Sequence, residues 1–352
     1  MLLTAANLFY YLHQGGLITP GALVAGDFCV VPGGSRHRTF AVPREQGPGY
    51  FVKQVKQWEP DTGQTLQTEA GWLRAATDDP LLAPLGSYVP RFYAYDPGSR
   101  VLVVEWLAGT PLSLHIARQG KLNLELAAEL GTALGTLQTR LAAGWPGGHP
   151  PAHFVPIRLW VLNEAGLPTG SSTQSPGQAE VLAALRRYPA FATRLADLRT
   201  TWEPTMLIHA DLKWDNWLLC RPALKIVDWE FAGIGDPAWD AGTLAQTFLT
   251  WWVGNAANPE AIEPDPPAQT QAAIRAFWTA YIAARGLNSV AARHLLDRTI
   301  ICAAARLIQT AYESMYHSTQ LSTIAVRLLQ LSLNILEDPQ AAIHELWGSP
   351  AA

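Results

Sequence analysis

The stretch LIHADLKWDNWLL, residues 207–219, holds a group of polar side chains between apolar flanks. Asp211, Lys213 and Asn216 follow one another at intervals of two and three residues, with tryptophans among them. Polar groups next to apolar segments are costly to bury unless they are paired or used. We therefore expect a turn with a chemical role here, not an ordinary surface loop.

The residues that follow this stretch predict a β-hairpin. The segments NWLLC (216–220) and KIVDWEF (225–231) carry two short apolar runs, which lie on either side of a turn at RPAL (221–224). Such a hairpin has Asn216 near its start and Asp228 at its end, so the two side chains can lie side by side. Amide and carboxylate oxygens form a hard site that suits Mg²⁺. With Asp211 available to orient an attacking hydroxyl, this is the inventory that phosphoryl transfer needs.

The composition is that of a globular protein without a polyelectrolyte partner. Of 352 residues, 49% are hydrophobic and 15% are charged, which is enough to bury a sizeable core. The net charge is only −4 and the basic residues are scattered, so neither nucleic-acid binding nor a membrane-surface patch is expected. The three cysteines are far apart and match no metal or disulfide pattern. The first residues lack the features of a signal peptide and no apolar run is long enough to span a membrane, so we expect a cytoplasmic protein.

Apolar periodicity predicts an α+β chain with a strand-rich first part and a helical remainder. In the first part we expect strands within 28–42, 49–55 and 92–107, and helices at 5–14 and 65–76. Further on we expect helices at 121–142 and about 177–199, and almost only helix beyond residue 240. The chain is therefore divided into a small antiparallel-sheet N-lobe, 1–108, with an extra N-terminal helix, and a large, mostly helical C-lobe, 109–352.

These motifs resemble those of kinase-like phosphotransferases. HADLKWDN (209–216) is similar to the catalytic loop H-R-D-L-x-x-x-N of protein kinases, with Ala210 in place of the arginine. VDWEF (227–231) stands where protein kinases carry D-F-G. The continuation GIGDPAWDAG (233–242) instead resembles the aminoglycoside phosphotransferase and choline kinase branch of this protein-kinase-like, two-lobed fold.

The resemblance implies a role for each residue of the motif. The reaction would be the ATP- and Mg²⁺-dependent transfer of a γ-phosphoryl group to an alcohol hydroxyl, with ATP between the lobes. Asp211 would orient the hydroxyl and Lys213 would steady the transferring group. Asn216 and Asp228 would hold the metal, and Asp240 would brace the catalytic loop.

The strand-rich part offers candidates for binding the nucleotide phosphates. Lys53 lies on a predicted strand and Glu69 on the next helix, where kinases carry a paired lysine and glutamate that position the α- and β-phosphates. Lys56 competes for this role, but strand alternation turns it to the opposite face.

Two further segments are nucleotide-binding candidates. The turn at 32–37 has glycines that let backbone amides approach a phosphate, which makes Gly33, Gly34 and Ser35 candidates. The resemblance places VEWLAG (104–109) at the connector between lobes, where the backbone of Glu105 and Leu107 would bind the adenine edge.

The acceptor stays open between a small-molecule alcohol and a Ser/Thr hydroxyl of a peptide, as in peptide natural-product biosynthesis, where a partner protein of the same pathway could take part. Small alcohols are usual for this branch, whereas Lys213, the tryptophans and the extra N-terminal helix favour a peptide. The acidic residues of the last helices, Asp297 and Glu313 among them, are too sparse to favour a polycationic aminoglycoside. An alternative is a pseudokinase that binds nucleotide and a partner without turnover. Pseudokinases commonly lack at least one of the residues that correspond to Lys53, Asp211, Asn216 and Asp228, and all four are present here.

Overall fold

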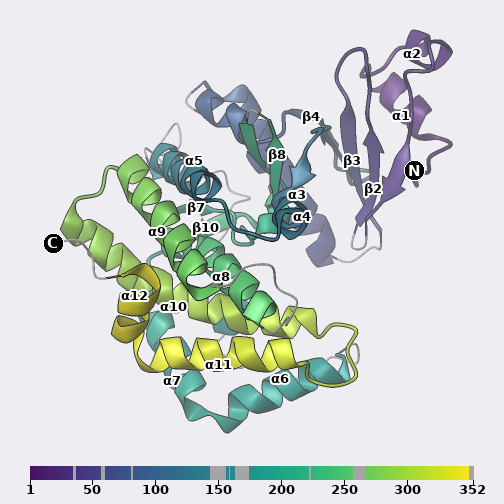
Figure 1. The fold of residues 1–352 in the computed structure, drawn as a ribbon. Coiled ribbons are helices and arrows are strands. Elements are labelled where there is room, and N and C mark those ends of the chain that lie inside the picture. Colours follow the sequence, from purple (N-terminus) through teal and green to yellow (C-terminus); the bar gives the residue numbers. More distant parts are fainter. Residues whose placement is uncertain are drawn as a thin grey trace. The chain divides into compact units, whose positions relative to one another are not determined.

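A computed structural model describes the chain except for residues 35–36, 57–59, 81, 143–155, 158, 163–173, 222, 257–265 and 349–352. The chain divides into two compact units (Figure 1). The first unit comprises Met1–Leu112 and Asp215–Ala232, and the second comprises the rest of the described chain. The hairpin that follows the catalytic loop thus packs with the N-terminal residues, although the loop before it belongs to the second unit.

An antiparallel sheet forms the centre of the first unit. Its strand order is β1-β2-β3-β5-β4. The strands are β1 (Val31–Gly33), β2 (His37–Val42), β3 (Tyr50–Val55), β4 (Phe92–Asp96) and β5 (Val101–Glu105). The helices of this unit are α1 (Leu8–Gln14), α2 (Pro20–Val24) and α3 (Pro60–Asp78), with a 3₁₀ turn η1 (Ala83–Ser87).

The two faces of this sheet have different roles because side chains alternate along each strand. Phe40, Val52 and Val103 point to one face, where they are buried with Leu8 and other residues of the first two helices. Each large apolar side chain buried in this way contributes about 1.5–3 kcal/mol. The extra N-terminal helix predicted from the sequence is therefore part of the core on this face of the sheet.

The predicted β-hairpin is present in a smaller sheet of the first unit. Strands β8 (Trp217–Cys220) and β9 (Ala223–Ile226) pair antiparallel, with Trp217 opposite Ile226, and β6 (Thr110–Pro111) lies beside β8. A single 3₁₀ turn, η4 (Trp229–Phe231), follows the hairpin. Trp229 is fully buried against Trp72 of α3, with ring centroids 4.9 Å apart. This contact anchors the segment that begins with Asp228.

The second unit is mostly helical. Its helices are α4 (Leu112–Gln119), α5 (Leu124–Ala142), α6 (Pro176–Arg187), α7 (Pro189–Thr200), α8 (Pro237–Ala256), α9 (Pro266–Arg285), α10 (Ser289–Ser314), α11 (Thr323–Glu337) and α12 (Pro339–Trp347). The shorter elements are a two-stranded sheet of β7 (Met206–Ile208) and β10 (Gly233–Gly235), and the 3₁₀ turn η2 (Trp160–Leu162). A further 3₁₀ turn, η3 (Trp214–Asn216), begins in the second unit and ends in the first. Helix α10 packs against both α8 and α11 (Figure 1).

Helices α8 and α10 approach closely because a glycine faces the contact. A Cβ on Gly242 would lie 2.8 Å from the backbone nitrogen of Ala303. The expected α+β class, with a small antiparallel sheet and a mostly helical remainder, is confirmed. None of the helices in the described parts of the chain is long and apolar enough to cross a membrane.

Two details of the predicted helices were wrong. The helix expected over about 177–199 is two helices, because Tyr188 is extended (φ −111°, ψ 98°) and α7 begins at Pro189. A proline disfavours helical backbone in the residue before it and has no N–H to continue the helix. Helix α4, which is only eight residues long, was not predicted.

Candidate active site

A cavity of about 480 Å³ opens in the first unit, a size typical of ligand sites. The β2, β3 and β5 side chains on the sheet face opposite α1 line one side of it, since the strand alternation turns Thr39, Phe51 and Lys53 away from the core. The connector after β5 and the hairpin β8–β9 with its continuation line the rest. The residues expected to bind nucleotide or metal that line this cavity are Gly34, Lys53, Glu69, Glu105, Leu107, Asn216 and Asp228.

Lys53 lies between two carboxylates in this cavity. Its Nζ is 2.9 and 2.8 Å from the two carboxylate oxygens of Glu69 and 2.6 Å from Oδ1 of Asp228. Burial alone lowers the pKa of Lys53, but the charges of Glu69 and Asp228 outweigh it, so the pKa lies above its usual value. The amine is therefore a cation at neutral pH, fixed in position by charge-assisted hydrogen bonds.

Asn216 and Asp228 are brought together by the hairpin, as its sequence predicted. The Val227 amide donates to the Asn216 carbonyl oxygen at 2.9 Å. Asp228 is the residue after Val227, so it follows directly on this last hydrogen bond of the hairpin. Asp228 has left-handed backbone (φ 68°, ψ 54°). A residue other than glycine pays on the order of 1–3 kcal/mol for such backbone, and strain of this kind is concentrated at functional sites.

This donor pair fits Mg²⁺ bound together with a nucleotide. Mg²⁺ is usually held by one or two carboxylates together with substrate phosphates and water. Within the described residues, no cluster of three or more His, Cys, Asp or Glu side chains could hold a metal ion. Asn216 and Asp228 supply an amide and a carboxylate oxygen at the cavity wall, so phosphate oxygens would complete the set.

The connector after β5 offers a flat apolar wall. The Phe51 and Trp106 rings are stacked, with centroids 6.1 Å apart and planes inclined by 24°. The Glu105 amide donates to the Arg91 carbonyl oxygen at 2.9 Å and the Trp106 amide to that of Gly49 at 3.0 Å. Leu107, the next residue, lines the cavity.

The glycine turn between β1 and β2 is only partly a cavity element. Gly34 lines the cavity with φ +88°, and a Cβ there would be 2.3 Å from the His37 carbonyl oxygen, so glycine is required. Gly33 is the last residue of β1. Ser35 lies outside the described residues.

A buried hydrogen bond beside this turn was not predicted from the sequence. His37 Nε2 lies 2.8 Å from Oε2 of Glu230, and both side chains are buried and line the cavity. Glu230 belongs to the VDWEF motif, but it lies 193 residues from His37 in the sequence, so no local sequence pattern predicts this contact.

Asp240 holds the backbone of the loop at 209–210 in the second unit, which is the bracing that the resemblance implied. The two carboxylate oxygens of Asp240 accept hydrogen bonds from the amides of His209 (2.8 Å) and Ala210 (2.9 Å). Ala210 has left-handed backbone (φ 68°), and its carbonyl oxygen accepts from the Trp239 indole at 2.8 Å. Burial raises the pKa of Asp240 to about 7, although both amide hydrogen bonds oppose the rise. His209 has a structural role too, since its Nδ1 accepts from the Asp211 amide at 3.3 Å.

The Asp211 carboxylate is clamped between two cations of the second unit. Its Oδ2 is 2.8 Å from Lys213 Nζ, and its Oδ1 is 2.6 Å from Nη2 of Arg306 on α10. Arg306 Nη1 also pairs with Oε1 of Glu313 at 3.1 Å. Arg306 was not among the predicted site residues, although a single arginine inside the apolar run 300–308 indicates a buried carboxylate partner.

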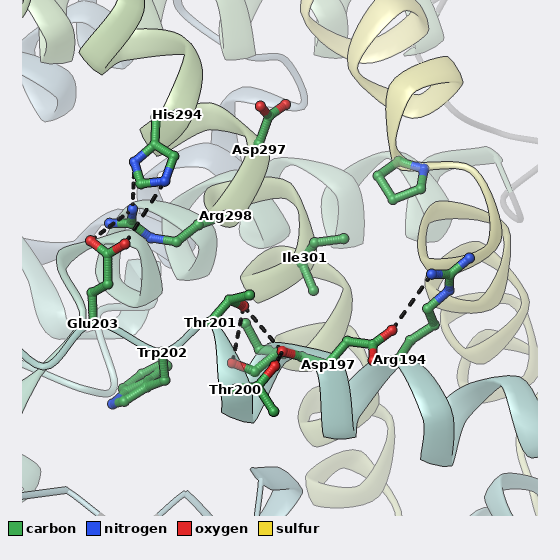
Figure 2. Close-up of a pocket in the computed structure, with 12 residues that line it drawn as sticks. Arg194, Asp197, Thr200, Thr201, Trp202, Glu203, His294, Asp297, Arg298 and Ile301 are labelled. Atoms are coloured by element: carbon green, nitrogen blue, oxygen red, sulfur yellow. Dashed lines mark hydrogen bonds and ion pairs between the residues drawn. The ribbon is translucent and has the colours of Figure 1, made fainter.

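A second cavity, about 460 Å³, lies near the C-terminal end of α7 (Figure 2). Its charged side chains pair with one another: Arg298 binds Glu203 at 2.9 Å, and Arg194 lies 3.6 Å from Asp197 (Figure 2). Arg298 also binds Asp236 at 3.1 Å. Because these charges are mutually compensated, the cavity gives no indication of a charged ligand.

Solved structures with this fold include two kinases. An amicoumacin kinase in complex with AMP-PNP, Ca²⁺ and Ami is 15% identical, with 94% of this chain and 93% of that chain covered and a TM-score of 0.58. A choline kinase from Cryptosporidium parvum Iowa II is 10% identical, with 98% and 99% covered and a TM-score of 0.58. At these identities the likeness establishes the protein-kinase-like fold that the motifs predicted.

Among curated relatives, a thiamine kinase of Salmonella paratyphi B is 40% identical over 57 residues, which are 15% of this chain. This chain spans 21% of that relative's length. A broader match comes from the model of the phosphotransferase enzyme family, which covers residues 27–287. Since this match includes most of the chain, and agrees with the resemblance of its motifs, the chain belongs to the phosphotransferase enzyme family.

Proposed function

We propose that this chain transfers the γ-phosphoryl group of ATP to a hydroxyl of a small molecule, with Mg²⁺ as the metal. The observation that carries the proposal is the arrangement around Lys53, whose ammonium group contacts Glu69 and Asp228 in a cavity that Asn216 also lines. A cation for the phosphates, a pair of metal ligands and an apolar wall for the base, all in one cavity, are the groups that bind a nucleoside triphosphate.

Each nucleotide-binding residue has a distinct role in this proposal. Lys53 neutralises the α- and β-phosphates, and Glu69 keeps its amine in position. The Glu105 carbonyl oxygen and the Leu107 amide bind the adenine edge, and the stacked Phe51 and Trp106 give the base an aromatic wall. Asn216 and Asp228 hold Mg²⁺, which on binding neutralises the phosphate charge that develops during transfer.

The second unit supplies the groups for the acceptor. Asp211 accepts the hydrogen bond of the acceptor hydroxyl and orients its oxygen, and Lys213 steadies the transferring phosphoryl group. Most of the rate enhancement then comes from positioning and charge neutralisation, because phosphoryl transfer leaves the protein little covalent chemistry to perform. An ATP-dependent reaction of this kind goes with a cytoplasmic location.

A small-molecule alcohol is the acceptor class that we propose. The names of the proteins similar to this chain are those of thiamine, choline and amicoumacin kinases, all of which act on small molecules. The extra N-terminal helix, which had favoured a peptide, is accounted for by its packing on the sheet. Lys213 and the tryptophans remain the features that favour a peptide hydroxyl.

The test is an ADP-release assay with Mg²⁺·ATP and a panel of acceptors: thiamine, choline, ethanolamine, neutral and aromatic alcohols, and Ser/Thr peptides. Asp211→Asn serves as the matched background, since it keeps the shape of the side chain. Acceptor-dependent ADP release by the wild type alone is the expected result. Release that never exceeds the Asp211→Asn background, despite nucleotide binding, would leave a pseudokinase as the better description, and turnover with peptides only would replace the acceptor class.

A further inference from the structure

Arg306 is a buried cation on an otherwise apolar segment of α10. Its side chain is 1% exposed, and its neighbours Ala303, Ala305 and Leu307 are fully buried. Taking a guanidinium group out of water costs several kcal/mol unless carboxylates pair with it. The carboxylates that pair with Arg306 are those of Asp211, at 2.6 Å, and Glu313, at 3.1 Å.

The helix packing explains how this arginine reaches the catalytic loop. Gly242 on α8 lets the backbone of α10 approach at Ala303, less than one turn before Arg306. Asp240, two residues before Gly242, holds the loop backbone at His209 and Ala210. The loop is therefore held at two points. Asp240 of α8 binds the loop backbone, and Arg306 of α10 binds the Asp211 side chain.

The two carboxylate oxygens of Asp211 have different partners. Arg306 engages Oδ1 from inside the helical core, and Lys213, which is about one third exposed, engages Oδ2. A planar guanidinium that is itself fixed by packing leaves the carboxylate little rotational freedom. Of the two cations, Lys213 on Oδ2 is the more exposed, whereas Arg306 on Oδ1 is buried.

We propose that Arg306 is a positioning residue for the phosphoryl transfer: by holding Oδ1 of Asp211 it presents Oδ2 to the acceptor hydroxyl. This inference rests on the proposed function. It predicts that loss of Arg306 lowers kcat without weakening nucleotide binding, whose proposed residues belong to the first unit. A misplacement of a catalytic group by about 1 Å costs on the order of 100-fold in rate.

The experiment compares Arg306→Lys and Arg306→Ala with Arg298→Lys and Arg298→Ala. Arg298 is a matched control, because it is on the same helix, is mostly buried and pairs with Asp236 and Glu203 instead of Asp211. We expect Arg306→Lys to lower kcat about tenfold and Arg306→Ala about 100-fold, with the KM for ATP unchanged. The Arg298 variants should keep the wild-type kcat per folded molecule, with the folded fraction of each variant measured by circular dichroism.

Added guanidinium ion provides a readout that a merely structural arginine does not give. It should restore part of the kcat of Arg306→Ala, because the cation can occupy the vacated space beside Asp211, and should leave the Arg298→Ala kcat unchanged. Wild-type kcat in Arg306→Lys, or equal losses in the Arg298 variants without selective rescue, would overturn the inference. A wild type without turnover on any acceptor would overturn the proposed function and this inference with it.

Discussion

Replacing Lys53 by methionine should separate what this lysine does for folding from what it does for nucleotide binding. The substitution keeps the length of the side chain and removes the charge that lies 2.8 Å from Glu69 and 2.6 Å from Asp228. Glu69 is 2% exposed, so it would remain as an unpaired buried carboxylate beside Asp228.

The loss of stability expected for Lys53→Met follows from the burial of the two carboxylates. Removing one partner of a buried ion pair costs about 3–5 kcal/mol. The Asp228 side chain is 38% exposed, so water screens its contribution and the Glu69 charge dominates the loss. For a chain of 352 residues, a destabilisation of that order lowers the melting temperature by roughly 4–7 °C.

The double variant Lys53→Met/Glu69→Met tests the reasoning, since replacing a whole buried ion pair by apolar residues is often neutral. It should recover most of the melting temperature but none of the nucleotide affinity. Lys56→Met is the control, because Lys56 is exposed and its Nζ makes a 3.4 Å hydrogen bond to the Gly34 carbonyl oxygen. The assay is thermal melting followed by circular dichroism, with and without an ATP analogue. A single variant as stable as Lys56→Met, or a double variant no more stable than the single one, would refute this account of Lys53.

The other predictions concern the loop, the glycine turn and the effect of pH. Asp211→Asn should keep the affinity for ATP and lower kcat at least about 100-fold, as expected for loss of a general base; full turnover in steady-state kinetics would exclude the proposed role. Gly34→Ala should weaken nucleotide binding measured by calorimetry, since its Cβ would lie 2.3 Å from the His37 carbonyl oxygen at φ +88°; unchanged affinity would mean that the turn is not used. The pKa of Asp240 is about 7 in the folded chain, against about 3.9 for an unfolded aspartate. The folded state therefore holds this proton more tightly, and the contribution of Asp240 to stability is largest below about pH 4 and is lost as the pH rises to about 7. The difference in melting temperature between the wild type and Asp240→Asn should change over that range, and a constant difference would contradict the shift.

Much of the fold was predictable because its signals are local in the sequence. Strand alternation around Lys53 is enough to put the lysine on one face of β3 and Val52 on the other. The hairpin that brings Asn216 and Asp228 together is encoded in about a dozen consecutive residues. The break between α6 and α7 is also encoded locally, by Pro189, although it was not predicted.

The contacts that were missed depend on residues far apart in the chain. Arg306 reaches Asp211 across 95 residues and His37 reaches Glu230 across 193. Which face of α10 meets α8 is decided by packing at Gly242 and Ala303, and no periodicity within α10 identifies that partner. Such pairs follow from tertiary structure, so the sequence marks them at most as buried charges that need a counter-charge.

Titration calorimetry with a non-hydrolysable ATP analogue, with and without Mg²⁺, tests the central claim most directly. The wild type should bind the analogue tightly only in the presence of Mg²⁺, and Asp228→Ala should lose this Mg²⁺-dependent binding. Asp215→Ala, next to the metal-ligand candidate Asn216 but not itself a candidate, should bind like the wild type. Binding that is indifferent to Mg²⁺, or an Asp228→Ala variant with unchanged Mg²⁺-dependent affinity, would contradict the proposal that this cavity holds Mg²⁺·ATP for phosphoryl transfer.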